Sequence, residues 1–169
     1  MKLHKYILLL ILLMVQLPDA KEISVMSLNA QNLFDTIDDS GKDDKAFLPI
    51  EKKESFEHKN SCNNISVKAW RMECLYQDWN EETKNAKLNN LVKIILSYNE
   101  HGADILGLQE IENINILEQL FNLLKPHGYI DFHLLESNDK RGVDTAFIAK
   151  YKISNPKLHY VKFSSDFET

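Results

Sequence analysis

The stretch Ala103–Asn113 (ADILGLQEIEN) decides how this chain is organised. It holds a short apolar run that begins after Gly102 and stops at Gln109-Glu110. An apolar run of this length, between a turn residue and a polar end, predicts a strand buried on both faces. Glu110 would then stand at the carboxyl end of a buried strand, where ligand crevices form in open α/β sheets. The other interpretation of Glu110 is an acid favoured near the N-terminus of the following helix.

Length and composition place the chain among globular proteins with one domain. It has 169 residues, of which 44% are hydrophobic and 27% are charged, and its formal net charge is −5. This charge excludes the broad basic surface of a protein that binds nucleic acid regardless of sequence. A phosphate-ester substrate would therefore need a local basic group or a bound cation for its attraction.

The first twenty residues have the pattern of a targeting segment. Lys2 and Lys5 precede the apolar run Tyr6–Leu17, and Ala20 offers a small residue for cleavage. This pattern predicts a signal peptide at residues 1–20 and a secreted or periplasmic mature protein. The apolar run is shorter than the roughly 20 residues of a transmembrane helix, so we expect no stable membrane span after cleavage. An uncleaved anchor is the alternative.

The rest of the chain alternates between strand and helix patterns. Glu22–Asn29 is mostly alternating and predicts a strand, whose end would bring the Asn29 amide into the same crevice as Glu110. Periodic apolar residues predict one helix at Thr83–Glu100 and a second that starts near Asn113. This order predicts an α/β fold in which helices cover a sheet. Three more strands are expected at Gly128–Glu136, Thr145–Ala149 and Lys157–Phe163.

The segment from about residue 38 to residue 82 is predicted to be a long, irregular insertion. It contains both cysteines of the chain, Cys62 and Cys74. An exported chain with two cysteines is expected to pair them in a disulfide. A metal site is the weaker interpretation, because His58 is the only histidine nearby.

Four segments carry motifs in a fixed order: Ile23–Asp35 (ISVMSLNAQNLFD), Asp43–Pro49 (DDKAFLP), Asp104–Leu120 (DILGLQEIENINILEQL) and Arg141–Ile148 (RGVDTAFI). Together they resemble the endonuclease/exonuclease/phosphatase superfamily, and within it the secreted or periplasmic bacterial nuclease-like members. The resemblance implies the DNase I-like fold, a four-layer α/β sandwich of two packed sheets. It also implies hydrolysis of phosphate esters with a divalent cation, usually Mg²⁺.

The resemblance also assigns roles to individual residues. Glu110 matches the metal-binding glutamate, and Asn29 matches the asparagine that helps to position metal or phosphate. Arg141 and Asp144 match a pair close to the site. Mg²⁺ is usually held by one or two carboxylates together with substrate phosphate, which suits this set. Arg141 would offer a fork of donors to a phosphate, and a surface salt bridge with Asp139 or Asp144 is its alternative role.

Two departures from the superfamily pattern bear on activity. Gln31 lies where some members carry an aspartate. The catalytic histidine, the Asp-Asn pair after a glycine and the final Asp-His pair of the superfamily have no match after Ile148. We therefore expect residues 21–169 to be the N-terminal part of such a domain, with the C-terminal half of the fold absent, and to be inactive on their own.

A non-catalytic remnant or binding protein is the alternative function. The substrate is left open among DNA, RNA, phospholipid head groups and small phosphate esters. The sequence gives no indication of the oligomeric state.

Overall fold

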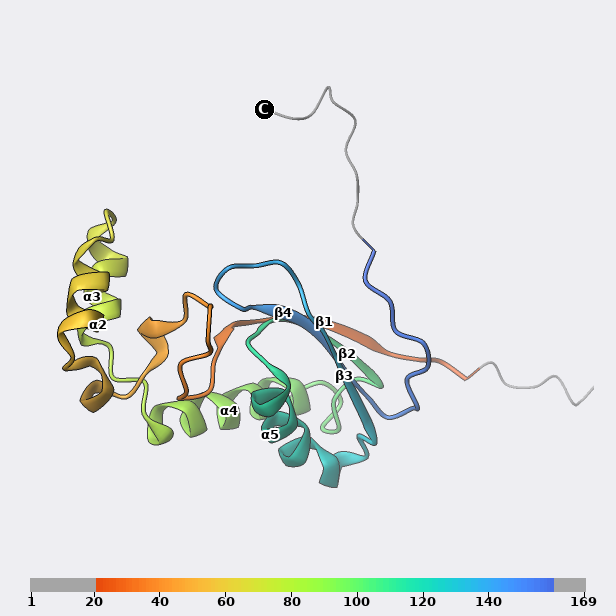
Figure 1. The fold of residues 1–169 in the computed structure, drawn as a ribbon. Helices are drawn as coiled ribbons and strands as arrows, with labels where there is room; N and C mark the ends of the chain where they lie inside the picture. The colour runs from red at the N-terminus through yellow and green to blue at the C-terminus, as the bar shows by residue number, and fades with distance from the viewer. Residues whose placement is uncertain (1–20, 160–169) are drawn as a thin grey trace, which may run out of the picture.

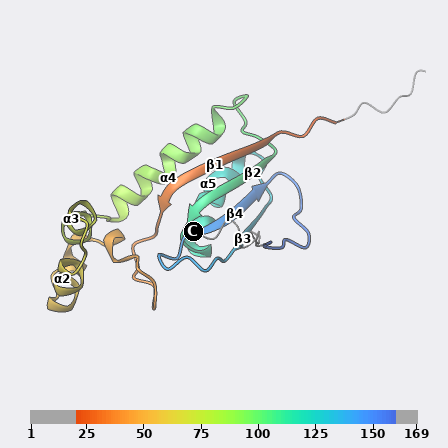
Figure 2. The same cartoon turned by 90° about the horizontal axis from the view of Figure 1, so that it is seen from above.

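A computed structural model describes residues 21–159, which form one sheet with helices on one of its faces (Figures 1 and 2). The predicted signal peptide at residues 1–20 lies outside the described residues. In chain order the elements are β1 (Val25–Leu33), the 3-10 helices η1 (Lys45–Phe47) and η2 (Ile50–Lys53), α2 (Phe56–Asn63), α3 (Lys68–Tyr76), α4 (Glu81–Leu96), β2 (Ile105–Ile111), α5 (Ile114–Leu124), the 3-10 helix η3 (Lys125–His127), β3 (Asp131–Leu135) and β4 (Asp144–Ala149).

The four strands form a mixed sheet in the order β1-β2-β4-β3. β1 and β2 are parallel, and β4 is antiparallel to both of its neighbours, β2 and β3. A parallel pair needs a long crossover connection, which the segment from η1 to α4 supplies. The strand predicted around the Leu-Gln-Glu motif is therefore β2, and it lies inside the sheet.

Burial along β2 alternates, so the prediction of a strand buried on both faces is wrong for one face. Leu106 and Leu108 are buried against the helices, whereas Ile105, Gly107 and Gln109 on the other face are only half-buried. The physical reason is that α4 and α5 both lie on one face of the sheet, as the two views show (Figures 1 and 2). The described residues thus supply one sheet and one helical layer of the expected sandwich.

Both covering helices begin at an asparagine that caps them. The Asn80 side chain accepts a hydrogen bond from Thr83 N, and the Asn113 side chain accepts from Asn115 N and Ile116 N. These bonds satisfy backbone donors that the first helical turn leaves free. From these starts, the apolar stripes meet the sheet and form the main core. Its largest members are Leu33, Leu88, Leu91, Ile95, Leu106, Leu108, Ile111, Ile116, Leu117, Leu120, Phe121, Leu124, Tyr129 and Ile148.

The insertion at about residues 38–82 is not irregular, because it holds two α-helices besides the short 3-10 turns. α2 and α3 lie side by side beyond the end of the sheet (Figures 1 and 2), and the Cys62–Cys74 disulfide joins them with a Cα–Cα distance of 5.6 Å. The disulfide prediction is confirmed. Lys53, only 1% exposed, ties the insertion together through Nζ, which donates hydrogen bonds to three backbone carbonyls.

Two further expectations concern the end of the described chain and the membrane. Residues Lys157–His159 are not in a strand, and the remainder of the strand predicted at Lys157–Phe163 lies outside the described residues. Within residues 21–159, no helix combines the length and the apolar character needed to cross a bilayer.

Candidate functional site

The regular pairing of β1 with β2 breaks at the end of the two strands. Asn29 pairs with Gln109, and the next pair along the strands is Leu33 with Ile111. Three residues of β1 therefore lie opposite a single residue of β2, which is Glu110. A bulge of this kind re-aims side chains, and bulges are common next to active sites.

Three residues at this bulge have a left-handed backbone. Gln31, Asn32 and Glu110 have φ angles of 53°, 61° and 60°. This conformation costs a residue with a side chain roughly 1–2 kcal/mol. Strained residues of this kind gather at functional sites, where the surrounding structure holds them in place. The bulge is thus a place where the fold maintains an unfavourable backbone, and Glu110 is at its centre.

Glu110 and Asn29 both bind the backbone of the bulge. Glu110 is half-buried, and its Oε2 accepts a hydrogen bond of 3.0 Å from Asn32 N. Asn29 is exposed, and its Oδ1 accepts a bond of 2.7 Å from Gln31 N. The structure thus brings the two residues to the same end of the sheet, each with a side-chain oxygen engaged by the bulge of β1.

Two cations lie near Glu110. Burial lowers the pKa of Lys87, while the negative charge of Glu110 acts to raise it. The hydrogen bond to Asp139 raises the pKa of Arg141, and the charge of Glu110 adds to this effect. The guanidinium Nη2 of Arg141 lies 3.1 Å from Asp139 Oδ2, so Arg141 does form the predicted surface salt bridge. Glu110 is thus an acid whose negative charge acts on both Lys87 and Arg141.

Asp144 lies at the start of β4, where it is buried. Its Oδ1 accepts a hydrogen bond of 2.6 Å from Ser137 N, and burial raises its pKa. Asp144 therefore holds the turn that carries Arg141. The two residues do not form an ion pair with each other, since Arg141 pairs with Asp139.

A cavity of about 410 Å³ opens between the bulge and the insertion. Asn32 and Arg141 line it on the side of the bulge, and Phe47, Trp70 and Lys45 line it on the side of the insertion. Trp70 lies on α3 and is 62% exposed. Asp43 and Glu73 also line the cavity, which thus combines two cationic and two acidic side chains with aromatic surface.

The sequence interpretation missed a group of acids beside this site. Asp35 and Glu112 are each 4% exposed, Asp44 is 1% exposed, and Asp39 is half-buried. One carboxylate oxygen from each of Asp39, Asp44 and Glu112 lies within 4.8 Å of the others. Asp39, Asp44 and Glu112, together with Asp35, form an acidic cluster. The signal that could have found it is the dense run of aspartates in residues 35–44 (DTIDDSGKDD).

Local hydrogen bonds build the acidic cluster. Glu112 Oε2 accepts from Asp35 N at 2.6 Å, and Asp44 Oδ2 accepts from Asp39 N at 2.8 Å. Burial raises the pKa of Glu112 to about 8, and the charges of Asp35, Asp39 and Asp44 raise it as well. Burial likewise raises the pKa of Asp44 to about 6. Negative charge is therefore costly at this place in the fold.

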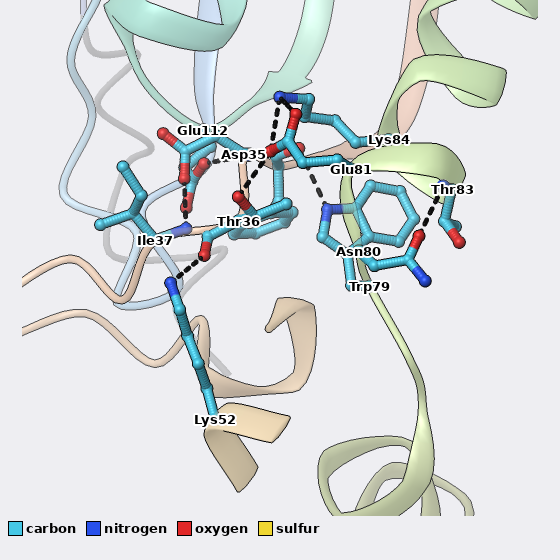
Figure 3. A network of polar contacts seen from close by, with 11 residues as sticks. Asp35, Thr36, Ile37, Lys52, Trp79, Asn80, Glu81, Thr83, Lys84 and Glu112 are labelled. Atoms are coloured by element: carbon cyan, nitrogen blue, oxygen red, sulfur yellow. Dashed lines mark hydrogen bonds and ion pairs between the residues drawn. The ribbon is translucent and has the colours of Figure 1, made fainter. Parts of the chain in front are cut away.

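A polar network holds the chain beside the acidic cluster against the start of α4 (Figure 3). Thr36 Oγ1 donates to Glu81 Oε1 at 2.9 Å, and Lys84 Nζ lies 2.8 Å from Glu81 Oε2. Thr36 O accepts from Lys52 Nζ at 2.9 Å, and the Trp79 indole donates to a backbone carbonyl one residue before Asp35. These bonds hold Thr36, the residue after Asp35, against the start of α4 and against η2.

One sheet covered by one helical layer, with polar groups at the strand ends, is consistent with part of the α/β sandwich of the DNase I-like phosphate-ester hydrolases. The sequence matches the Endonuclease/Exonuclease/phosphatase family over residues 70–166, which is more than half of the chain. The chain belongs to this family, whose members act on phosphate esters and generally use a divalent metal. Neither the curated proteins nor the solved structures contain a match to it.

Proposed function

We propose that this chain provides the metal-binding and phosphate-binding groups of an exported, divalent-cation-dependent phosphodiester hydrolase. The observation that carries the proposal is the bulge at the end of β1 and β2. It holds Glu110 in a left-handed backbone, and the negative charge of Glu110 acts to raise the pKa of both Lys87 and Arg141. Strain of this kind persists only where the fold supports it, which favours a functional role for Glu110.

The residues present fit a hard cation such as Mg²⁺. The bulge offers one carboxylate and one amide oxygen, the donor types that Mg²⁺ prefers when it keeps several waters. Glu110 would hold the ion, and the Asn29 oxygen retains a lone pair beside its bond from Gln31 N. The ion would stabilise negative charge on the phosphoryl oxygens of the substrate.

The groups of this chain would bind the substrate on either side of the ion. Lys87 and Arg141 supply positive charge for a phosphate. The exposed Trp70 in the cavity supplies an aromatic face on which a nucleobase can stack, which is a sequence-tolerant way to bind a single strand. Phe47 is itself stacked on Phe34. Nucleic acid is therefore the substrate class that this cavity favours among the phosphate esters of the family.

Hydrolysis needs more than these groups. No residue of this sequence matches the histidine, the Asp-Asn pair or the Asp-His pair of the superfamily. A bound cation without an oriented nucleophile should give little rate. We therefore expect metal-dependent binding of a phosphodiester, and no turnover, from this chain by itself.

A non-catalytic binding protein is the second candidate function. Two contacts favour it: the Asn29 oxygen is bonded to Gln31 N, and the Arg141 guanidinium is paired with Asp139. A catalytic site would have to release the Arg141 guanidinium toward the substrate, and the Asn29 oxygen would have to bind the ion through its remaining lone pair. The two candidates differ in whether binding of a phosphodiester depends on a divalent cation.

The experiment measures binding of a fluorescently labelled, single-stranded oligonucleotide to the full chain by anisotropy, with Mg²⁺ and with chelator. We expect binding that requires Mg²⁺, is weakened at least about tenfold in Glu110→Gln because the carboxylate charge is lost, and is competed by inorganic phosphate. Glu118→Gln, an exposed acid on α5, is the matched control and should bind like the wild type. If the affinity for the oligonucleotide is the same with Mg²⁺ and with chelator, and the same in the wild type and in Glu110→Gln, the binding-protein alternative is supported and the metal assignment is contradicted.

A further inference from the structure

The acidic cluster gathers four carboxyl groups that no cationic side chain of the described residues pairs with. Asp35, Asp44 and Glu112 are all more than nine-tenths buried. No ion pair formed within residues 21–159 includes any of these three residues or Asp39. Buried carboxylates are normally paired with a cation or coordinate a metal, because an isolated buried charge is very costly.

One buried oxygen of the acidic cluster accepts no hydrogen bond from the described residues. Asp44 Oδ1 is fully buried and has no hydrogen-bond partner in the described part of the chain, and it is the only buried side-chain oxygen or nitrogen there in that condition. The other oxygen of the same carboxylate accepts from Asp39 N. An unsatisfied buried acceptor in a native structure calls for an ion, a water or a proton as its partner.

We propose that the acidic cluster is a second cation site, separate from the Glu110 bulge, and that it binds Ca²⁺ through Asp39, Asp44 and Glu112. The three oxygens come from the loop after β1 and from the residue that follows β2, and they converge within 4.8 Å of one another. All the donors are hard carboxylate oxygens, which suit Ca²⁺ and Mg²⁺ and exclude the soft metals.

Ca²⁺ fits the cluster better than Mg²⁺. Mg²⁺ dehydrates reluctantly and is usually bound by one or two carboxylates with several waters. Ca²⁺ accepts six to eight oxygens in flexible geometry and is commonly bound by several carboxylates. A cluster of three converging carboxylates, two of them closed off from solvent, therefore matches Ca²⁺.

The role of this ion would be to fix structure. Asp39 and Asp44 flank the tight turn that contains Gly41, whose φ is 82°, and Glu112 follows the last residue of β2. An ion shared by these residues would tie the loop to the sheet. The same loop continues into η1, where Lys45 and Phe47 line the cavity beside Arg141. Binding of Ca²⁺ would thus order one wall of the substrate cavity.

Two measurements on the full chain, after treatment with chelator, test this site. The first is the shift of the melting temperature with added Ca²⁺, and with Mg²⁺ at equal concentration. The second is Tb³⁺ luminescence, because Tb³⁺ replaces Ca²⁺ and is excited through a nearby tryptophan. Trp79 is positioned for this, since its indole bonds to the carbonyl that precedes Asp35.

The variants separate the acidic cluster from the Glu110 site. We expect Ca²⁺ to raise the melting temperature of the wild type and of Asp43→Asn, an exposed neighbouring acid, by the same amount. Glu110→Gln should keep the larger part of this shift, because it removes only the binding of an ion at the Glu110 bulge. Asp44→Asn should lose the larger part of the shift and should lose the Tb³⁺ signal that Ca²⁺ competes away. Without metal, Asp44→Asn should melt higher than the wild type because repulsion is relieved, which also shows that it folds.

Three outcomes would overturn the proposal. The first is that Ca²⁺ leaves the melting temperature of the wild type unchanged. The second is a Ca²⁺ shift that Asp44→Asn retains, or that Glu110→Gln abolishes, because the ion would then occupy the other site. The third is a Mg²⁺ shift equal to the Ca²⁺ shift, which would contradict the choice of ion. Glu112→Gln provides a second test of the cluster if Asp44→Asn fails to fold.

Discussion

The backbone N–H of Asn32 donates a hydrogen bond of 3.0 Å to Glu110 Oε2, across the bulge between β1 and β2. Both residues have a left-handed backbone. The carboxylate of the family motif is thus oriented by a strained residue of the neighbouring strand, 78 positions earlier in the sequence. The position of this carboxylate depends on the bulge as much as on its own strand.

The strain at the bulge predicts a stabilising substitution at Gln31. Its φ is 53° and its side chain is exposed, while its backbone N–H and carbonyl make the bonds to Asn29 and Lys87. Glycine keeps those bonds and removes the left-handed penalty, so Gln31→Gly should raise the free energy of unfolding by about 0.5–1 kcal/mol. Urea denaturation checks this. Gln31→Ala is the control and should bring no gain; equal stability of the two variants would show that the strained backbone is absent in solution.

The buried ammonium of Lys53 predicts a large loss of stability on its removal. Nζ donates to Gln77 O at 2.7 Å, to Ala46 O at 2.8 Å and to Glu73 O at 3.3 Å. Lys53→Met would fill the space but leave buried carbonyls without a donor, at a cost of about 2 kcal/mol. Thermal unfolding measures the loss. Lys59→Met, on an exposed lysine, should change stability by less than about 0.5 kcal/mol, and similar effects of the two substitutions would contradict the role given to Lys53.

Because of the disulfide, we expect that its loss unfolds the insertion while the sheet stays folded. Cys62 and Cys74 are separated by 12 positions, and closing a loop of this size contributes on the order of 2–4 kcal/mol. In a Cys62→Ala/Cys74→Ala variant, α2 and α3 should become sensitive to protease and lose amide protection. The amides of β2 and β4 should stay protected, because the main core contains neither cysteine. Simultaneous loss of protection in both regions would show that the insertion and the sheet unfold as one unit.

The elements that the sequence predicted well are those with a strong apolar pattern. The helices covering the sheet bury regular stripes of large side chains, and β2 and β4 contain alternating buried and half-buried residues, so periodicity located them to within a few residues. β3 is half-buried throughout, and its concentration of apolar residues located it. The helices α2 and α3 were not predicted, because each buries only one residue, its cysteine. The disulfide joins the two helices, and Lys53 donates hydrogen bonds to the Glu73 and Gln77 carbonyls at the end of α3. Neither contact produces an apolar period in the sequence.

The candidate site was predictable only in part. The end of an apolar run located Glu110, and the family motif located Asn29, both at the end of the sheet where they were expected. The bulge was not predictable in full, because Gln31 and Glu110 are residue types that rarely adopt a positive φ, whereas Asn32 is of a type that adopts it more readily. The acidic cluster depends on a contact between Asp44 and Glu112, which are far apart in sequence and which no local pattern connects.

The order of strands in the sheet has a consequence for how the chain acquires its structure. The connection between the paired strands β1 and β2 contains the whole insertion and α4. The connection between β3 and β4 is a short turn, and the connection between β2 and β3 contains α5. Closing a long loop costs more entropy than closing a short one, and non-local pairing slows folding. We therefore expect β2, α5, β3 and β4 to fold first, with β1 docking last. The bulge would then be completed only in the final step, so a chain stalled before that step would hold Glu110 without its partner Asn32.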